Sequence, residues 1–514
     1  QLGDVIESIL TLLYSSDYLY WVDVPLLAVA LLFYYKKKHT EKNTTLGFLT
    51  FGLGTLIILF TAFYPLKETF SDQYKVALTG IVPAHVYDLF QLIYKQAYTK
   101  EALASQQMEI KEIKEYFQKN QKLQKTSPYY GKFKGQNLIV IQAESLNNFP
   151  IGLKVNGEEI TPVLNNLIGQ SHYYPNTFLQ IGRGNTSDAE FVANNSLYPM
   201  SKAGVYKAFP INKYLSLANV LKRAGYSTSA SHGNSAEFWN RQLAYPEQGY
   251  QAFYHKDHPK IKADEIIGLG ISDESIFRQM IDIYTEEKKP FYNFIVSLTN
   301  HRPFELPNEY QYLNLPKEFK KTNTGNYLQG VKYFDKSLGT FIEKLKKEHL
   351  WDNTIFVVYG DHYGPLPKDK TEIKSLLNVD FNQKEQFKIP LIIHHPKQTK
   401  GEVNEIVASQ MDIYPTLTSL LGINQELIQF GKPLDTKHEG FVGFAFETTR
   451  YSFYSDKYDY IASHDGVFSS GKCIDSKSQK QTDITACRKN YTKLYKDIDL
   501  STSLLENNFI NIIQ

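Results

Sequence analysis

Short apolar runs alternate with longer segments of helical pattern from Asn137 onward. The clearest runs cover residues 137–142, 291–298 and 354–359, and their unbroken apolar character is typical of strands buried on both faces. Strands that alternate with helices usually form a parallel sheet, because each helix returns the chain to the same edge. The pattern therefore predicts an α/β domain over residues 136–514, with a mainly parallel central sheet flanked by helices.

The first 64 residues follow a different pattern. Two mostly apolar runs, residues 18–35 and 46–64, each approach the length of about 20 residues that crosses a bilayer. The loop between them is rich in lysine at positions 36–38, and the positive-inside rule places such a loop in the cytoplasm. We therefore expect residues 1–64 to be a partial transmembrane region with two visible spans, and the chain after it to lie outside the cell. Two buried helices of a soluble domain are the alternative, which leaves the lysine cluster unexplained.

Residues 65–135 have the pattern of a helical connector next to the membrane. Residues 76–98 mix apolar and aromatic side chains with few charges, which is typical of an interfacial helix. Residues 101–124 are rich in lysine, glutamate and glutamine and lack a strong apolar stripe. That composition indicates a solvated helix that acts as a spacer.

Composition and charge exclude several classes of protein. Lysine and arginine number 56 and aspartate and glutamate 54, so the formal net charge of +2 gives no sign of a nucleic-acid partner. With 42% apolar and 21% charged residues, the chain is not intrinsically disordered. Its two cysteines are too few for an iron–sulfur cluster. Cys473 and Cys487 would form one local disulfide in an oxidising compartment and remain thiols in the cytosol, so the predicted outside location favours the disulfide.

Polar side chains follow the three predicted strands. Glu144 comes after the first, Asn300 and His301 after the second, and Asp361 and His362 after the third. Ligands of open α/β sheets bind just beyond the carboxyl ends of the strands. We therefore expect these side chains to meet as metal ligands, with ordinary loop polarity as the alternative.

The segment 182–190, with two glycines before Thr186, has the features of a phosphate-binding helix start. Ser187 and Glu190 have the spacing of a capping box, which predicts that a helix begins at Ser187. A helix N-terminus behind a glycine-containing loop favours phosphate or sulfate. A hydroxyl at this position can coordinate a metal, lose its proton and attack phosphorus. The alternative is that Thr186 only caps the helix.

Six motifs, in order and spacing, resemble the lipoteichoic acid synthase family over roughly residues 135–450. They are Glu144-Ser145, Glu159–Leu164, Gly182–Glu190, His232–Arg241, Leu298–His301 and Tyr359–Gly364. The resemblance implies an alkaline-phosphatase-like, sulfatase-like domain outside a Gram-positive cell, attached to N-terminal transmembrane helices. Family members usually carry five such helices, so this chain would lack the earlier ones.

The resemblance also implies a metal site and a nucleophile. The metal ligands would be Glu144, Thr186, Asp361 and His362, and Thr186 would also be the catalytic nucleophile. Mn²⁺ is the metal that the family implies, with Mg²⁺ or Zn²⁺ as alternatives for such a mixed ligand set.

Four further residues would line the substrate pocket, namely His232, Trp239, Arg241 and His301. Arg241 would hold phosphate oxygens in a bidentate contact. Either imidazole could position or protonate a leaving oxygen. For Trp239, simple packing in the pocket wall is the alternative.

The implied reaction has two steps. Thr186 attacks the phosphorus of phosphatidylglycerol and releases diacylglycerol, and a hydroxyl of a glycolipid anchor or a growing polyglycerolphosphate chain then resolves the glycerophosphoryl-threonine.

Two positions depart from the synthase pattern. They are Asn185, where a lysine often stands, and Pro365-Leu366, and they leave polymerase, primase and a differently specific paralogue open. A phosphoethanolamine transferase or a sulfatase-like hydrolase would share the fold. The transferases usually have more disulfides, and the hydrolases usually have a cysteine or serine nucleophile. A non-catalytic cell-envelope binding protein would not need all four ligands.

Overall fold

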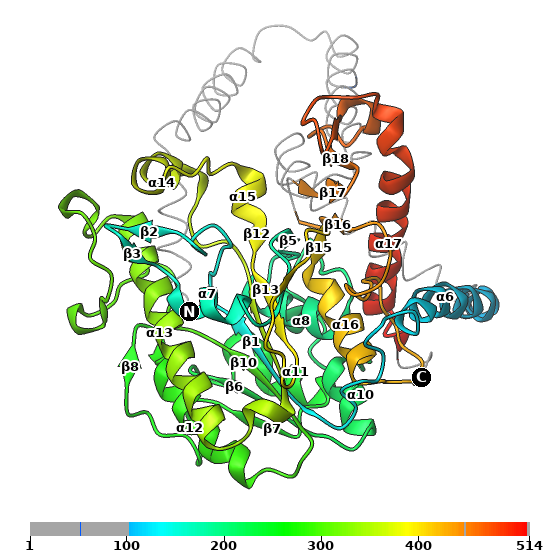
Figure 1. Ribbon diagram of the computed structural model, residues 1–514. Helices are drawn as coiled ribbons and strands as arrows, with labels where there is room; N and C mark the ends of the chain where they lie inside the picture. The colour runs from blue at the N-terminus through cyan, green and yellow to red at the C-terminus, as the bar shows by residue number, and fades with distance from the viewer. Residues whose placement is uncertain (1–51, 53–101, 447–448, 511–514) are drawn as a thin grey trace, which may run out of the picture. The chain divides into compact units, whose positions relative to one another are not determined.

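The computed structural model describes residues 52, 102–446 and 449–510. Its centre is an eight-stranded sheet with the strand order β14-β4-β13-β11-β1-β10-β6-β7 (Figure 1). The three predicted strands lie side by side and parallel in the middle of it, as β11 (Thr354–Gly360), β1 (Asn137–Ala143) and β10 (Phe291–Val296). Every residue of these strands is buried, which explains their unbroken apolar runs.

The sheet is mixed rather than parallel throughout. The parallel arrangement continues from β10 into β6 (Ser227–His232) and β7 (Ala252–Tyr254). On the other side of the centre, β13 (Leu391–His394) runs antiparallel to both of its neighbours, β11 and β4 (His172–Tyr173). Because β4 and β14 are parallel to each other and antiparallel to β13, β13 is the one reversed strand of this sheet, and the predicted mainly parallel sheet is confirmed.

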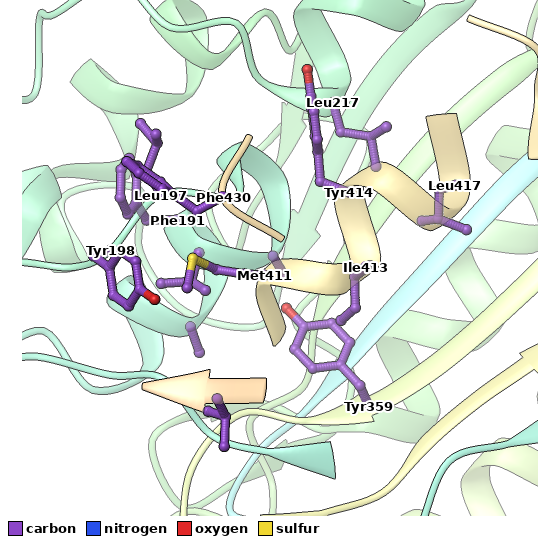
Figure 2. Close-up of a cluster of buried hydrophobic side chains, with 14 of the residues drawn as sticks. Phe191, Leu197, Tyr198, Leu217, Tyr359, Met411, Ile413, Tyr414, Leu417 and Phe430 are labelled. Carbon is purple, nitrogen blue, oxygen red and sulfur yellow. The ribbon is translucent and has the colours of Figure 1, made fainter. Parts of the chain in front are cut away.

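Helices cover both faces of the sheet and bury alternate residues of β1. On one face Ile139 and Ile141 belong to the same apolar cluster as side chains of α7 (Pro162–Ile168), α12 (Asp273–Glu286) and α13 (Asn323–Lys347). On the opposite face the cluster includes side chains of α8 (Thr186–Asn195), α10 (Leu217–Arg223) and α16 (Ile413–Leu420). Figure 2 shows part of this second cluster, where Phe191, Tyr359 and Tyr414 come from three distant segments.

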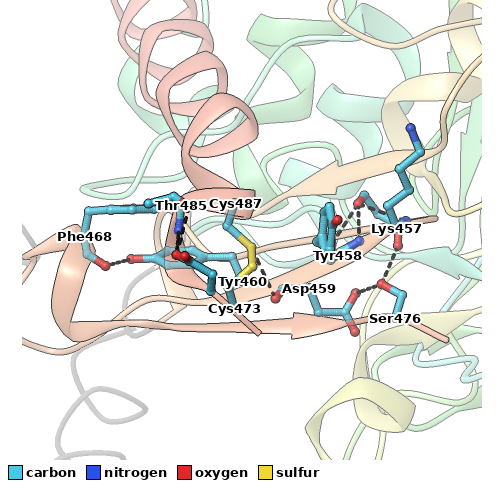
Figure 3. Close-up of a disulfide and its surroundings, with 11 residues drawn as sticks. Lys457, Tyr458, Asp459, Tyr460, Phe468, Cys473, Ser476, Thr485 and Cys487 are labelled. Atoms are coloured by element: carbon cyan, nitrogen blue, oxygen red, sulfur yellow. Dashed lines mark hydrogen bonds between the residues drawn. A yellow bond between two sulfur atoms is a disulfide. The ribbon is translucent and has the colours of Figure 1, made fainter. Parts of the chain in front are cut away.

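A smaller antiparallel sheet and the last long helix form the C-terminal part of the described chain. The sheet consists of β16 (Phe441–Gly443), β17 (Phe453–Ser455), β18 (Tyr458–Ile461) and β19 (Lys472–Asp475). The predicted pair Cys473–Cys487 is joined in a disulfide, which ties β19 to the start of α17 (Arg488–Glu506) (Figure 3).

Several shorter elements complete the described fold. They are β2 (Lys154–Val155), β3 (Glu158–Glu159), β5 (Thr177–Phe178), α9 (Val205–Ala208), α11 (Arg241–Gln248), β8 (Ile266–Ile267), β9 (Gly270–Ile271), α14 (Lys370–Leu377), α15 (Gln383–Phe387), β12 (Lys388–Ile389), β14 (Glu402–Val403) and β15 (Ala408–Ser409).

The helix expected at residues 101–124 is present as α6 (Ala102–Gln124). The second half of α6 is not a free spacer, because Ile113 and Phe117 are buried and the Phe117 ring packs on Phe430 at 5.1 Å. The two predicted membrane spans and the predicted interfacial helix lie outside the described residues. No helix among the described residues is long and apolar enough to cross a membrane.

Candidate active site

The ends of β1 and β11 bring two carboxylates together. Ala143 pairs with Gly360 in the parallel ladder, so Glu144 and Asp361 are the next residues on adjacent strands. Both side chains are buried. Ser145 connects them, because its backbone N–H donates to Asp361 Oδ1 at 2.7 Å and its hydroxyl donates to Glu144 Oε1 at 2.9 Å.

Thr186, the first residue of α8, faces these carboxylates. Its Oγ1 lies 3.4 Å from Glu144 Oε2 and 3.3 Å from His362 Nε2. His362 Nε2 is also 3.4 Å from Glu144 Oε1 and 3.4 Å from Asp361 Oδ2. The four predicted metal ligands therefore surround one small volume at the carboxyl end of the sheet.

These residues fit a divalent cation. Asp361 Oδ2 is buried without a hydrogen-bond partner among the described residues. Burial, and then the negative charge of Glu144, raise the pKa of Asp361 well above its usual range. A cation would supply the missing partner and offset the repulsion between the two carboxylates. Carboxylate, hydroxyl and imidazole ligands together suit Mn²⁺, Mg²⁺ or Zn²⁺.

The loop before Thr186 is held by Asp188 rather than by a capping box. Helix α8 begins at Thr186, and the Ser187 hydroxyl donates back to the carbonyl of Gly184. The carboxylate of Asp188 accepts N–H groups of Gly182 at 3.1 Å and Gly184 at 2.7 Å, and of Val205 at 3.0 Å. The predicted capping box is wrong, because Asp188 takes the loop amides and Glu190 is engaged elsewhere.

The partner of Glu190 is Arg241. The guanidinium donates from Nη2 to Glu190 Oε1 at 2.5 Å and from Nε at 3.1 Å, and the Tyr245 hydroxyl donates to Glu190 Oε2 at 2.7 Å. Arg241 has no exposed surface. Here the guanidinium makes a bidentate contact with the carboxylate of Glu190 in α8, and its predicted contact with phosphate stays a prediction.

The histidines of the predicted pocket lie farther along the same edge of the sheet. In the ladder Gln142 pairs with Val296, and Val296 pairs with His232, so His232 ends a strand two places from β1. Burial, and then the charge of Arg241, lower the pKa of His232 well below its usual range, so its imidazole is neutral. His232 Nδ1 lies 3.0 Å from the Val296 carbonyl and so carries the proton. His301 is half-buried and close enough for its charge to affect His232.

Trp239 lies against the loop that carries Thr186. Gly204 lies between the Trp239 ring and this loop. A Cβ atom added at Gly204 would lie only 2.9 Å from Gly184 Cα and 3.5 Å from the Trp239 ring. Trp239 is half-buried and has a left-handed backbone, with φ of 59°. Its ring therefore lies close to the loop before Thr186, and its predicted role in the pocket wall stays a prediction.

Three positioning residues could not be found from the motifs alone. Gln142 donates from Nε2 to the Thr186 carbonyl at 3.1 Å and accepts the Tyr359 hydroxyl at 2.5 Å. Gln410 donates to the carbonyls of Gly360 and Asp361, at 3.0 and 2.6 Å. Asp188 lies within the Gly182–Glu190 motif, but the spacing of that motif does not reveal that Asp188 binds the loop amides. The signal for Gln142 was its place inside an apolar strand, and Gln410 has no local signal.

Comparison with known proteins agrees with this geometry. The sulfatase family model matches residues 136–423, and the model of the lipoteichoic acid synthase N-terminal domain matches residues 1–101. The lipoteichoic acid synthase of Staphylococcus saprophyticus is 31% identical over 96% of this chain and 77% of that relative. The chain belongs to the lipoteichoic acid synthase family. As a member of this family it is a glycerophosphotransferase.

Other members and solved structures extend the comparison. Lipoteichoic acid synthase 1 of Bacillus subtilis is 30% identical over 88% of this chain and 72% of its own. The crystal structure of the lipoteichoic acid synthase LtaP from Listeria monocytogenes superposes with a TM-score of 0.70 at 28% identity, covering 76% of this chain and 98% of that one. An alkaline phosphatase superfamily protein from Vibrio parahaemolyticus, with a TM-score of 0.59 and 21% identity over 75% of this chain and 90% of its own, shares the fold.

Proposed function

We propose that this synthase-family chain carries glycerophosphate on Thr186, from phosphatidylglycerol to a glycolipid anchor or a growing polyglycerolphosphate chain. The observation that supports it most is the position of the Thr186 hydroxyl. It stands at the N-terminus of α8, beside Glu144 and His362. A helix N-terminus favours the phosphate that would be attacked there.

In the first step Thr186 Oγ forms a bond to phosphorus, and the bond between phosphorus and the diacylglycerol oxygen breaks. The hydroxyl proton moves toward Glu144 Oε2, the acceptor 3.4 Å away. His301 protonates the departing diacylglycerol oxygen through Nε2, because His232 is fully buried and neutral whereas His301 is only half-buried. The product is diacylglycerol and glycerophosphoryl-Thr186.

The second step reverses these transfers. The acceptor hydroxyl gives its proton to His301 and bonds to phosphorus, and the phosphorus–Oγ bond breaks as Thr186 regains its proton from Glu144. His232 accepts a hydrogen bond through its free Nε2 and orients the acceptor. Glu144, Asp361 and His362, with Thr186 beside them, would hold the divalent cation, Mn²⁺ by family resemblance, which would favour the ionised hydroxyl and offset the phosphate charge.

We also propose that residues 1–64 belong to a transmembrane region and that residues 136–514 form an extracellular catalytic domain. Residues 65–135 are then a helical connector that joins the two. The match of residues 1–101 to the synthase N-terminal domain supports this arrangement. So does the disulfide between Cys473 and Cys487, since disulfides persist in oxidising compartments.

The test is turnover of labelled phosphatidylglycerol by the purified full chain. Metal-stripped protein should release no diacylglycerol, and Mn²⁺ should restore release. Asp361→Asn should prevent the restoration, whereas the exposed Asp352→Asn should behave like the wild type. A metal-free sample with full activity would contradict the proposal, and water as the preferred acceptor in the presence of glycolipid would show a hydrolase instead.

A further inference from the structure

Exposed apolar side chains gather beside the loop that carries Thr186. Ile211 is 69% exposed, Phe238 44% and Leu243 48%. Phe238 precedes Trp239 in a short 3₁₀ turn, and their rings meet edge to face at 6.0 Å. Leu243 follows in the first turn of α11.

Ile211 belongs to the same surface, because its loop is tied at both ends to this segment. Asn240 Nδ2 donates to the Tyr206 carbonyl at 3.4 Å, at the start of the loop. At the end of the loop, Lys213 pairs with Glu247 of α11 at 2.5 Å. We call Ile211, Phe238, Trp239 and Leu243 the rim patch.

The rim patch adjoins the reacting group. Trp239 packs on Gly204, and Gly204 packs on Gly184, two residues before Thr186. Only Gly204 therefore lies between this apolar surface and the loop that ends at Thr186.

The charges around the rim patch favour an anionic lipid surface. Three exposed positive side chains, Arg183, Lys202 and Lys207, stand here against the one exposed negative side chain of Glu237. Lys213 and Glu247 pair with each other and add no net charge. Lys207 Nζ lies 4.4 Å above the Trp239 ring. Aromatic rings and lysines beside exposed aliphatic groups are typical of proteins that lie in the headgroup region of a bilayer.

We propose that the rim patch inserts into the surface of an anionic phospholipid bilayer and so brings Thr186 to the phosphate of a lipid that stays in the membrane. The docking rests on the patch itself, and the identity of the reacting lipid rests on the proposed function. Ile211, Phe238 and Leu243 enter the upper acyl region, and Lys207 remains at the phosphate level.

Insertion is tested with one fluorophore on the full chain. Both native cysteines are in the disulfide, so Leu243→Cys provides one thiol for an environment-sensitive dye. In vesicles of phosphatidylglycerol and phosphatidylcholine, lipids with a spin label on the acyl chain should quench the dye at position 243 several-fold more than at the control Val467→Cys, which is equally exposed. Equal quenching at the two positions overturns the proposal.

The consequence for turnover is tested with Ile211→Ser, Phe238→Ser and Leu243→Ser combined. This variant should lose at least about tenfold in turnover of vesicle-embedded phosphatidylglycerol and keep the wild-type rate on a short-chain, monomeric phosphatidylglycerol. Val403→Ser with Val467→Ser, both exposed elsewhere, should change neither rate. An equal loss on both donors overturns the proposal. A wild type inactive on both donors refutes the proposed function, while the quenching result still decides the docking.

Discussion

The Arg241–Glu190 pair shows how two charged motif residues can depend on each other for their stability in the core. The two side chains are buried and form three hydrogen bonds with each other, and Tyr245 adds a fourth to the carboxylate. A buried charge that loses its partner is costly, whereas an exposed pair contributes little.

Arg241→Ala should therefore lower the free energy of unfolding by about 3–5 kcal/mol, because it leaves Glu190 buried without a countercharge. Arg278→Ala is the matched control, since Arg278 pairs with Asp264 at 2.6 Å on the surface and its loss should cost less than about 1 kcal/mol. Denaturant unfolding of the two variants makes the measurement. If Arg241→Ala has normal stability and fails only in turnover, the residue grips phosphate as its motif suggested.

At the scale of elements, helix α7 depends on a carboxylate from another helix. The side chain of its N-cap residue, Thr161, accepts none of the free backbone N–H groups of the first turn. Asp335 of α13 accepts the N–H groups of Val163 at 3.0 Å and Leu164 at 2.8 Å instead. Burial is the largest effect on Asp335 and raises its pKa from 3.8 to about 6.

The raised pKa has a definite consequence for stability. The folded protein holds a proton on Asp335 between pH 4 and 6 that the unfolded chain has released, so this contribution is complete below pH 4 and is lost as the pH rises through 6. Asp335→Asn cannot titrate. The free energy of unfolding of the wild type relative to this variant should thus fall by up to about 3 kcal/mol from pH 4 to 6.5. Parallel pH profiles of the two proteins would contradict the assignment.

At the scale of the molecule, the central sheet and the ligand cluster could be predicted because both depend on local patterns. Each of the three middle strands is an apolar run followed by polar residues, and parallel strands present those ends at one edge. Glu144, Asp361 and His362 meet after β1 and β11, whereas Asn300 and His301 after β10, which were also expected, are not part of this cluster. The antiparallel direction of β13 leaves no local mark, since its run of Leu391–His394 looks like any buried strand. Gln410 and the pairing of Arg241 with Glu190 depend on contacts between distant segments, which spacing alone does not reveal.

The disulfide links the fold to the proposed location of the domain. Peptide mapping of the full chain without reduction should find the Cys473 and Cys487 peptides cross-linked. Replacing both by serine should lower the free energy of unfolding by about 3 kcal/mol, as expected for a loop of this length. Two thiols that alkylate freely in protein from intact cells would contradict both the bond and the extracellular placement.

The central claim is that Thr186 carries the glycerophosphoryl group, and mass spectrometry of quenched protein tests it most directly. Wild-type protein mixed with phosphatidylglycerol alone should show a glycerophosphate adduct on the peptide that contains Thr186. Thr186→Ala should fold, form no adduct and lose diacylglycerol release by several orders of magnitude, as expected when a nucleophile is removed. An adduct on a different residue, or diacylglycerol release by Thr186→Ala at the wild-type rate, would contradict the account.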